Sequence, residues 1–417
     1  MKKAVYFILV LMSTFSLSNA QSVADGVKFI KYQKLRSALE TFNQLYKNNS
    51  KDLQTVYWYG QALLANKDII GAKNVYQKAL QDGINDPLIW VAMGHVEIRE
   101  SGDLNAAKQK FDQAITATTA TKGKNKGKPD VAILNAIGRA NADGSSKDGD
   151  PNYGIDKLKM AGEIDPTNAE AFISMGICYQ KLGGDMGGEA VKSYMEATTR
   201  DAKNAEAFWR MGKIYASQGN QPMLDQNFNA AIQANQEFPL AYYELYKYYQ
   251  DKDVNKAKGY LDNYIKYADK DCNTDFFQAD YLFRIGSYKE ALDKTKAMEA
   301  GNCKNFDGLS IMYAFIYDRL GDSVSAKQNI EKYFASSTPD KIDAGHYDLA
   351  VKVLSKFPGN EQKIAGYLQM AIDNDTSKVA KTRYAKQAAD VMAKAKMYTE
   401  QAKWLQKYID YKGALVE

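Results

Sequence analysis

Apolar and aromatic residues surround a glycine in one short string after another: VYWYGQAL, IWVAMGHV, AILNAIGRA, AFISMGICY and AFWRMGKIY. The glycines of the series are Gly26, Gly60, Gly94, Gly138, Gly176 and Gly212, of which the first three lie 34 residues apart. A fixed period of this length is typical of stacked repeats. The pattern therefore predicts a helical hairpin that recurs along the chain.

A second marker lies in the helix expected after each string. Small residues stand where two helices must approach closely: Ala38, Ala72, Ala107, Ala190, Ala257, Ala291, Ala326 and Ala402. Many are followed four residues later by a large apolar side chain, as at Phe42, Tyr76, Phe111, Tyr194, Leu261 and Ile330. These spacings line one helix face. Several repeats then end in turn residues before a proline, as at Asp86-Pro87, Asp165-Pro166 and Thr338-Pro339.

The combined pattern resembles the tetratricopeptide repeat: a bulky residue, Gly and an aromatic, then Ala, an aromatic and Ala, then Asp-Pro. The resemblance covers about residues 24 to 412 and yields about eleven hairpins, with Tyr246, Ala279, Ala314 and Val353 in place of the glycine in later ones. It implies an all-α, right-handed α-solenoid whose concave face is lined by the first helix of each pair. One hairpin cannot bury its apolar face alone, so neighbours share a continuous core.

Residues 1–20 read as a cleavable export signal. Lys2 and Lys3 precede an apolar stretch from Val5 to Leu11, and Ser18-Asn19-Ala20 supplies small residues before a cut at Gln21. The residue directly after that cut is Gln21 and not a cysteine, which argues against a lipid anchor. We expect a solenoid over 21–417 that is soluble and periplasmic, with outer-membrane association through a partner left open.

The charge of the chain is nearly balanced. The formal charge of +5 falls to +3 once the two lysines of the signal are removed. This balance, together with export, argues against a nucleic-acid partner.

Two insertions interrupt the period, and we expect both to be flexible. Residues 116–130 carry four lysines between glycines, at Lys122, Lys124, Lys126 and Lys128. We expect a solvated loop, with a contact for an anionic partner as the alternative. Residues 142–152 hold clustered aspartates, but no glutamate closes an EF-hand loop, so we expect no metal there.

The sequence offers little catalytic chemistry. Its two histidines, His95 and His346, lie some seven hairpins apart, and no HExxH, GxSxG or Walker motif is present. Cys178 lies within a helical pattern and has no histidine in its repeat. We expect a protein that is not an enzyme and uses no cofactor.

Two functions compete. The resemblance implies an interaction scaffold that binds a peptide or partner protein of the cell envelope along its concave groove. The alternative is a glycan- or nutrient-binding solenoid at the outer membrane, although such proteins usually carry an anchoring cysteine and large loops. Oligomeric state stays open.

The cysteines predict one disulfide. Cys272 lies just before the first helix of a hairpin and Cys303 just after the second, so antiparallel helices bring them to the same side. Because an exported protein meets an oxidising compartment, we expect these two to pair and Cys178 to stay free and packed.

The groove prediction selects residues one to four steps from the core face of each first helix. The set mixes aromatic and cationic side chains, which are common at binding hot spots. Its members are Tyr57, Gln61, His95, Arg99, Asn135, Arg139, Trp209, Lys213, Tyr243, Lys247, Phe276, Arg284, Phe315 and Arg319. The alternative is that these side chains cover seams between repeats and pair with neighbouring carboxylates.

Overall fold

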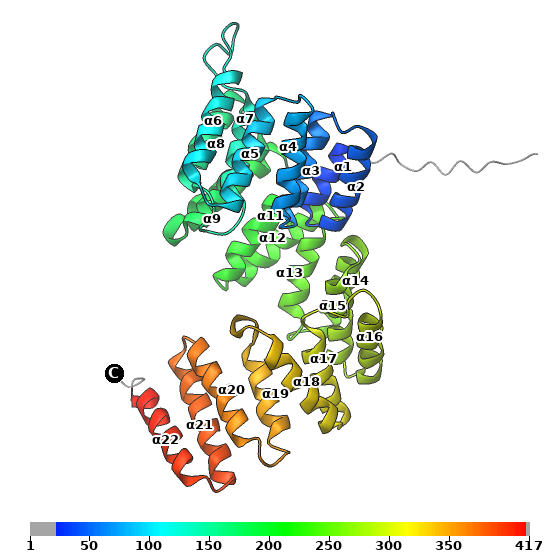
Figure 1. Cartoon of the computed structure of the whole chain (residues 1–417), viewed down its shortest axis with the longest axis vertical. Coiled ribbons are helices and arrows are strands. Elements are labelled where there is room, and N and C mark those ends of the chain that lie inside the picture. The colour runs from blue at the N-terminus through cyan, green and yellow to red at the C-terminus, as the bar shows by residue number, and fades with distance from the viewer. Residues whose placement is uncertain (1–21, 414–417) are drawn as a thin grey trace, which may run out of the picture. The chain divides into compact units, whose positions relative to one another are not determined.

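The computed structural model describes residues 22–413, and over that range it contains 22 α-helices and two short 3₁₀ helices, Gly184–Met186 and Pro339–Lys341 (Figure 1). The expected signal at 1–20 lies outside the described residues. Two compact units are present: unit 1 comprises 22–245 with 267–269, and unit 2 comprises 246–266 with 270–413. No helix within 22–413 combines the length and apolar character needed to cross a bilayer.

Successive helices pair into eleven hairpins, as the sequence predicts. The first six hairpins and the first helix of the seventh consist of α1 (Val23–Lys31), α2 (Leu35–Asn48), α3 (Leu53–Ala65), α4 (Ile69–Gln81), α5 (Pro87–Glu100), α6 (Leu104–Thr118), α7 (Val131–Ala142), α8 (Pro151–Ile164), α9 (Ala169–Leu182), α10 (Gly187–Arg200), α11 (Ala205–Ser217), α12 (Gln221–Ala234) and α13 (Pro239–Tyr249). The remaining helices are α14 (Val254–Tyr267), α15 (Cys272–Arg284), α16 (Tyr288–Ala300), α17 (Leu309–Leu320), α18 (Ser323–Ser336), α19 (Ala344–Leu354), α20 (Glu361–Asn374), α21 (Lys378–Lys394) and α22 (Tyr398–Gly413). This confirms the all-α hairpin array.

Polar side chains mark where many of these helices begin. Asp52 accepts a hydrogen bond from the Thr55 amide at the start of α3, and Asn168 and Asn204 cap α9 and α11 in the same way. Such caps satisfy amides that have no partner within the helix. The turn residues between repeats therefore also fix the first residue of the next hairpin.

The repeated glycines admit a large side chain from the second helix of the hairpin. A Cβ atom added at Gly212 would lie 2.5 Å from two ring carbons of Phe228, and Gly94 faces Phe111 in the same way. Both rings are almost completely buried. The glycine thus sets how closely the two helices of a hairpin approach.

Unit 1 brings its first hairpin against the segment that precedes α13. Lys28 Nζ lies 2.7 Å from a carboxylate oxygen of Glu237, and the rings of Tyr32 and Phe238 meet edge to face at 5.0 Å. The Ser37 amide also donates to Asp269 at 3.1 Å. The first helices of unit 1 consequently surround a common interior.

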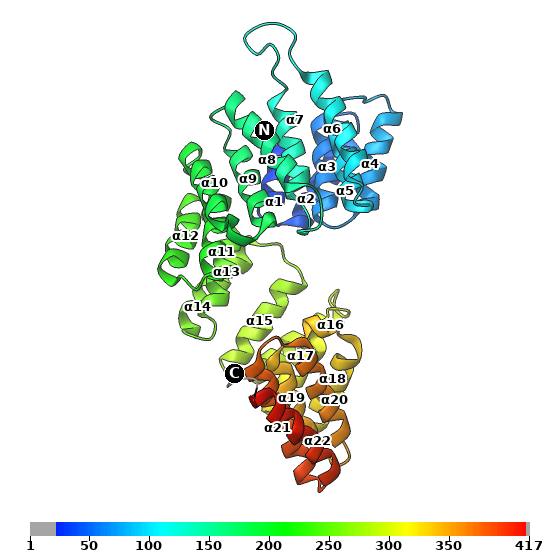
Figure 2. The same ribbon diagram turned by 90° about the vertical axis from the view of Figure 1, so that its left-hand side faces the viewer.

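In unit 2, successive helices from α17 to α22 pack side by side (Figure 2) and share one buried apolar cluster. Cys272, the first residue of α15, and Cys303, which follows α16, form a disulfide with Cα atoms 5.5 Å apart. Cys178 is free and buried. Both predictions for the cysteines are confirmed.

The two insertions are shorter than expected, because helices extend into both. α6 continues through Thr118, so the lysine-rich loop covers 119–130, and the second loop covers 143–150 between α7 and α8. Two backbone hydrogen bonds between Ala120 and the 127–128 segment close the first loop on itself. The lysines of this loop are exposed.

Candidate functional site

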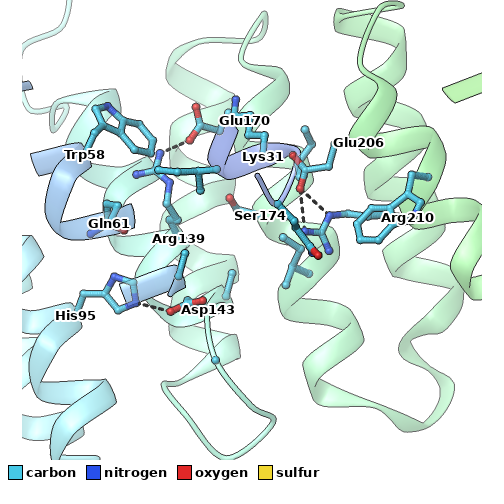
Figure 3. A pocket seen from close by; sticks show the side chains of 18 residues that line it. Lys31, Trp58, Gln61, His95, Arg139, Asp143, Glu170, Ser174, Glu206 and Arg210 are labelled. Carbon is cyan, nitrogen blue, oxygen red and sulfur yellow. Dashed lines mark hydrogen bonds and ion pairs between the residues drawn. The ribbon is translucent and has the colours of Figure 1, made fainter. Parts of the chain in front are cut away.

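In the part of each unit that the structure describes, the first helices of the hairpins contribute most of the lining of a concave site. In unit 1, α1, α3, α5, α7, α9 and α11 surround a cavity of about 290 Å³ (Figure 3). In unit 2, α13, α15, α17, α18 and α19, with the segments before α17 and α19, line a groove of about 550 Å³. We call these the unit 1 cavity and the unit 2 groove.

Arg139, on α7, organises one side of the unit 1 cavity. Its guanidinium donates to the Tyr57 hydroxyl at 2.6 Å, pairs with the Glu170 carboxylate and stacks 4.5 Å from the ring centre of Trp58. The positive charge of Arg139, helped by Lys31, outweighs burial and lowers the pKa of Glu170 to about 2. Arg139 and Glu170 are therefore both charged at neutral pH.

A second ion pair, which is half-buried, lies on α11. Arg210 donates through Nε to Glu206 Oε1 at 2.9 Å, and its Nη2 lies 2.8 Å from the same oxygen. Trp209 lies beside this pair and is 5% exposed. Its indole N–H is buried without an acceptor among the described residues.

Asp143 closes the lower end of the cavity in the view of Figure 3. Its carboxylate lies 3.0 Å from Nε2 of His95 and also pairs with Arg99. Burial alone would raise the pKa of Asp143, but the bond from His95 and the charge of Arg99 hold that pKa well below its usual value. His95 thus orients a carboxylate. The side-chain hydrogen bond that His95 makes within the described residues is to Asp143, which is not a nucleophilic hydroxyl or thiol.

The loop 143–150 is held by an ammonium group. Lys181 Nζ donates to the backbone carbonyls of Asn141, Asp143 and Asp148 at 2.9, 2.5 and 2.7 Å. Burial lowers the pKa of Lys181. Within 22–413 no three His, Cys, Asp or Glu side chains cluster as metal ligands would. The converging oxygens here contact a lysine.

The unit 2 groove is more aromatic. Phe283 and Phe315 contact one another with ring centres 5.8 Å apart, and Phe276 packs on Phe306 at 5.3 Å. Phe276, Phe283 and Phe315 are only half-buried, so part of each ring lines the groove. His346 borders the groove 6.0 Å from the Phe315 ring.

The cations of the unit 2 groove differ in their partners. Arg284 pairs with Asp280 and Asp251, and Lys341 pairs with Asp307 at 2.6 Å. Lys247 is exposed, lines the groove and has no hydrogen bond or ion pair to any residue of the described range. Lys247 is therefore available for a negative charge on a ligand.

The structure distributes the predicted groove residues over both sites. Four line the unit 1 cavity: Gln61, His95, Arg139 and Trp209. Four others line the unit 2 groove: Lys247, Phe276, Arg284 and Phe315. The other six line neither site: Tyr57, Arg99, Asn135, Lys213, Tyr243 and Arg319.

Several predicted residues are engaged within the fold. Tyr57 is buried and holds Arg139, while Gln61 donates to the Tyr76 hydroxyl at 3.0 Å. Asn135 accepts from the Asn168 side chain at 3.0 Å. Lys213 lies 3.6 Å from Glu244. The alternative of seam-covering and paired side chains therefore describes these residues. Gln61, Asn135 and Lys213 find their partners within their own hairpin or on the next one, and Tyr57 finds its partner two hairpins further along.

Other lining residues escaped the prediction. Trp58, Ser174 and Arg210 each stand two positions before the repeat glycine, and all three line the unit 1 cavity. Glu170 and Glu206 each stand six positions before it, in the repeated string AEAF. The fixed positions of these residues before the repeat glycine are a signal from which they could have been predicted. Phe283 of unit 2 has no such signal, because its hairpin lacks that glycine.

Neither a protein-family model nor a curated protein matches the sequence of this chain. Among solved structures, a tetratricopeptide repeat protein from Parabacteroides merdae is 20% identical, covers 57% of this chain and 92% of its own, and gives a TM-score of 0.46. Yeast Tom70 is 12% identical over 92% of this chain and 91% of its own, with a TM-score of 0.43. The C-terminal part of a repeat protein from Cytophaga hutchinsonii is 13% identical over 61% and 98%, with a TM-score of 0.33.

These likenesses concern the helical fold alone. The repeated glycine and its large partner, the paired helices and the capped turns belong to this chain itself. The part of the chain that the structure describes is an all-helical array of tetratricopeptide-type hairpins.

Proposed function

We propose that this protein is a non-enzymatic interaction scaffold of the bacterial cell envelope that binds an extended peptide segment of a partner in the unit 2 groove. The observation that carries the proposal is the row of half-buried phenylalanines, Phe276, Phe283 and Phe315, beside the unpaired Lys247. A few well-packed anchor residues, often aromatic, carry most of the binding energy at an interface. A cation without a partner favours an acidic residue in the ligand.

The two units support this choice by contrast. In unit 1 the charged side chains at the centre pair with one another, as Arg139 does with Glu170 and Arg210 with Glu206. The unit 2 groove offers apolar ring surface and about 550 Å³ of space. Several aromatic or aliphatic side chains of an extended segment fit a groove of this kind.

A reactive thiol is disfavoured by its surroundings. Burial raises the pKa of Cys178 to about 12, so the nucleophilic thiolate is scarce at neutral pH. This supports a binding role for the protein.

Location in the envelope rests on the sequence of residues 1–20. The two lysines, the apolar stretch and the small residues before Gln21 are the features that support export. Mass spectrometry of the N-terminus, together with cell fractionation, tests the proposal. An intact Met1 in the cytoplasmic fraction would contradict it.

The binding experiment is capture of partners from an envelope extract by the full chain. Lys247→Glu and Phe315→Ala should each weaken capture about tenfold, because one reverses the free charge and the other removes an anchor. Lys332→Glu is the matched control, since Lys332 is an exposed lysine on the second helix α18, outside the groove. Helical circular dichroism and the melting temperature should hold for all three.

Capture that survives the Lys247→Glu and Phe315→Ala double variant would exclude the groove as the binding surface. A thermal-shift screen of sugars runs beside the capture. Saturable stabilisation by a sugar, with no saturable protein partner, would favour the glycan-binding alternative.

A further inference from the structure

Two hydrogen-bond donors on residues that line the unit 1 cavity have no acceptor within the described residues. The Trp209 indole N–H is buried and meets no acceptor within the described residues. The Ser174 side chain, 6% exposed, also lines the cavity. A buried donor without an acceptor is costly, and native proteins rarely keep one without a reason.

The charges of the cavity cancel in pairs, with one cation left over. Arg139 pairs with Glu170, Arg210 with Glu206, and Asp143 with Arg99 and His95. Lys31 is half-buried at the end of α1 and lies beside Glu170 in Figure 3. No carboxylate of the described residues is within ion-pair distance of its ammonium group, although Lys31 does help to lower the pKa of Glu170.

The walls and the volume limit what can enter. Trp58 and Trp209 supply aromatic surface, and Ile30 and Ile173 supply aliphatic surface. A cavity of about 290 Å³ holds roughly ten waters at the volume of the liquid. It therefore suits a compact molecule, whereas the larger unit 2 groove suits a peptide.

We propose that the unit 1 cavity binds a small carboxylate-bearing molecule, whose carboxylate pairs with Lys31, whose body packs against Trp58, and one of whose oxygens accepts the Ser174 hydroxyl proton. A cationic ligand is disfavoured because Glu170 and Glu206 are already neutralised by their arginines. This inference is separate from the peptide function assigned to unit 2. A sugar acid and an amino-acid-derived acid share the required chemistry.

The test is titration calorimetry on the full chain with glucuronate and with N-acetylalanine, each against its neutral counterpart, glucose or N-acetylalanine amide. At least one carboxylate should bind saturably below ~10 mM, at least tenfold more tightly than its neutral counterpart. Tryptophan fluorescence should change on the same titration, because two tryptophans line the cavity. Glucuronate binding alone identifies a sugar acid, and N-acetylalanine binding alone identifies an amino-acid-derived acid.

Matched variants locate the site. Lys31→Gln and Ser174→Ala should each weaken binding, the first about tenfold and the second by a smaller factor. Lys31→Arg should retain it. Lys34→Gln makes the same charge change outside the cavity, so it should leave affinity unchanged.

Three results would overturn the proposal. One is the absence of saturable binding by either carboxylate up to ~10 mM, and another is equal binding by the neutral counterparts. The third is undiminished binding to a folded Lys31→Gln variant, with folding judged by circular dichroism. Lys247→Glu, which alters the unit 2 groove, should not affect carboxylate affinity.

Discussion

The distance between the two helices of a hairpin depends on the combined volume of two facing residues, one on each helix. Gly212 faces the Phe228 ring, and the hairpin of α17 and α18 places Ala314 and Ile330 in one buried cluster. Both pairs are separated by sixteen residues. A larger residue on the first helix therefore accompanies a smaller one on the second, which explains why the later hairpins fold without the glycine.

Gly212→Ala should destabilise unit 1 by about 1–3 kcal/mol, because the new methyl group would overlap Phe228. Alanine otherwise favours a helix by up to about 1 kcal/mol, so the sign of the change is informative. Urea unfolding followed by circular dichroism measures it. Adding Phe228→Ile should recover part of the loss, and purely additive effects of the two changes would contradict the volume pairing.

Gly188→Ala is the control, because Gly188 lies in the first turn of α10 and a Cβ there meets no atom within 4 Å. This variant should be as stable as the parent or slightly more stable.

Charge at Glu170 gives unit 1 a dependence on acid. Its pKa is lowered from 4.5 to about 2, so its ionised form stabilises the fold above pH 4.5, and that stabilisation is lost as pH falls from about 4.5 towards 2. With discount for its partial exposure, we expect about 1–2 kcal/mol. Glu170→Gln should flatten the pH dependence of the unfolding free energy in this window.

Glu163→Gln is the matched control, since Glu163 is exposed on α8. Equal pH profiles for the two variants would show that the Arg139 pair contributes nothing.

At the scale of helices and turns, the link between the helices of one hairpin recurs with the same backbone. A left-handed residue occupies it in several hairpins: Gln33, Lys67, Gly102, Gly219, Gly286, Gly321 and Lys396. Only glycine adopts this conformation without steric cost. The chain thus tolerates a glutamine or a lysine at a turn position where several other hairpins use glycine.

Lys67→Gly should raise the stability of unit 1 by up to about 1 kcal/mol, because relief of the left-handed strain exceeds the extra entropy that glycine loses on folding. Differential scanning calorimetry measures the shift. Lys47→Gly, within the last turn of α2, should instead destabilise by about 1 kcal/mol. A loss of stability in Lys67→Gly would show that the lysine side chain contributes more than its backbone costs.

The hairpins and their order could be predicted from sequence because they depend on neighbouring residues. The period of the glycines and the spacing of Cys272 and Cys303 are local properties that the fold keeps. The carbonyls around Lys181 could not be predicted, because Asn141 and Asp148 meet this lysine only once two hairpins have packed. The clustered aspartate side chains of the loop raised the question of a metal site, whereas the backbone carbonyls of the loop contact Lys181.

Across the whole molecule, the two units differ in covalent support, because unit 2 alone contains the disulfide. Changing Cys272 and Cys303 to serine should lower the stability of unit 2 by about 3–4 kcal/mol in the chain-entropy model. Hydrogen exchange resolved by peptide should show faster exchange in α15 and α16 and no change in α3 to α7. Two free thiols at these positions in native protein, found by non-reducing peptide mapping, would refute the pairing.

The unit 1 cavity lies beyond prediction from the repeat pattern for a reason of distance. Its lining draws on Lys31 and on Arg210, which are brought to one interior by the contact of the first hairpin with Glu237 and Phe238. A pattern with a 34-residue period predicts which hairpins are neighbours, but it does not predict which distant hairpins come into contact. Individual side chains of the cavity could be predicted from the sequence, but the long-range contact that brings them together could not.

That same contact changes how unit 1 should unfold. In an open array each hairpin touches only its neighbours, so the terminal hairpin frays first. Here Lys28 bonds a residue 209 positions away and Ser37 one 232 positions away, so opening α1 and α2 also breaks contacts with the segments that precede α13 and α15. Such distant pairings slow folding and join the ends into one cooperative block. The amide protons of α1 and α2 should then exchange as slowly as those of an interior hairpin.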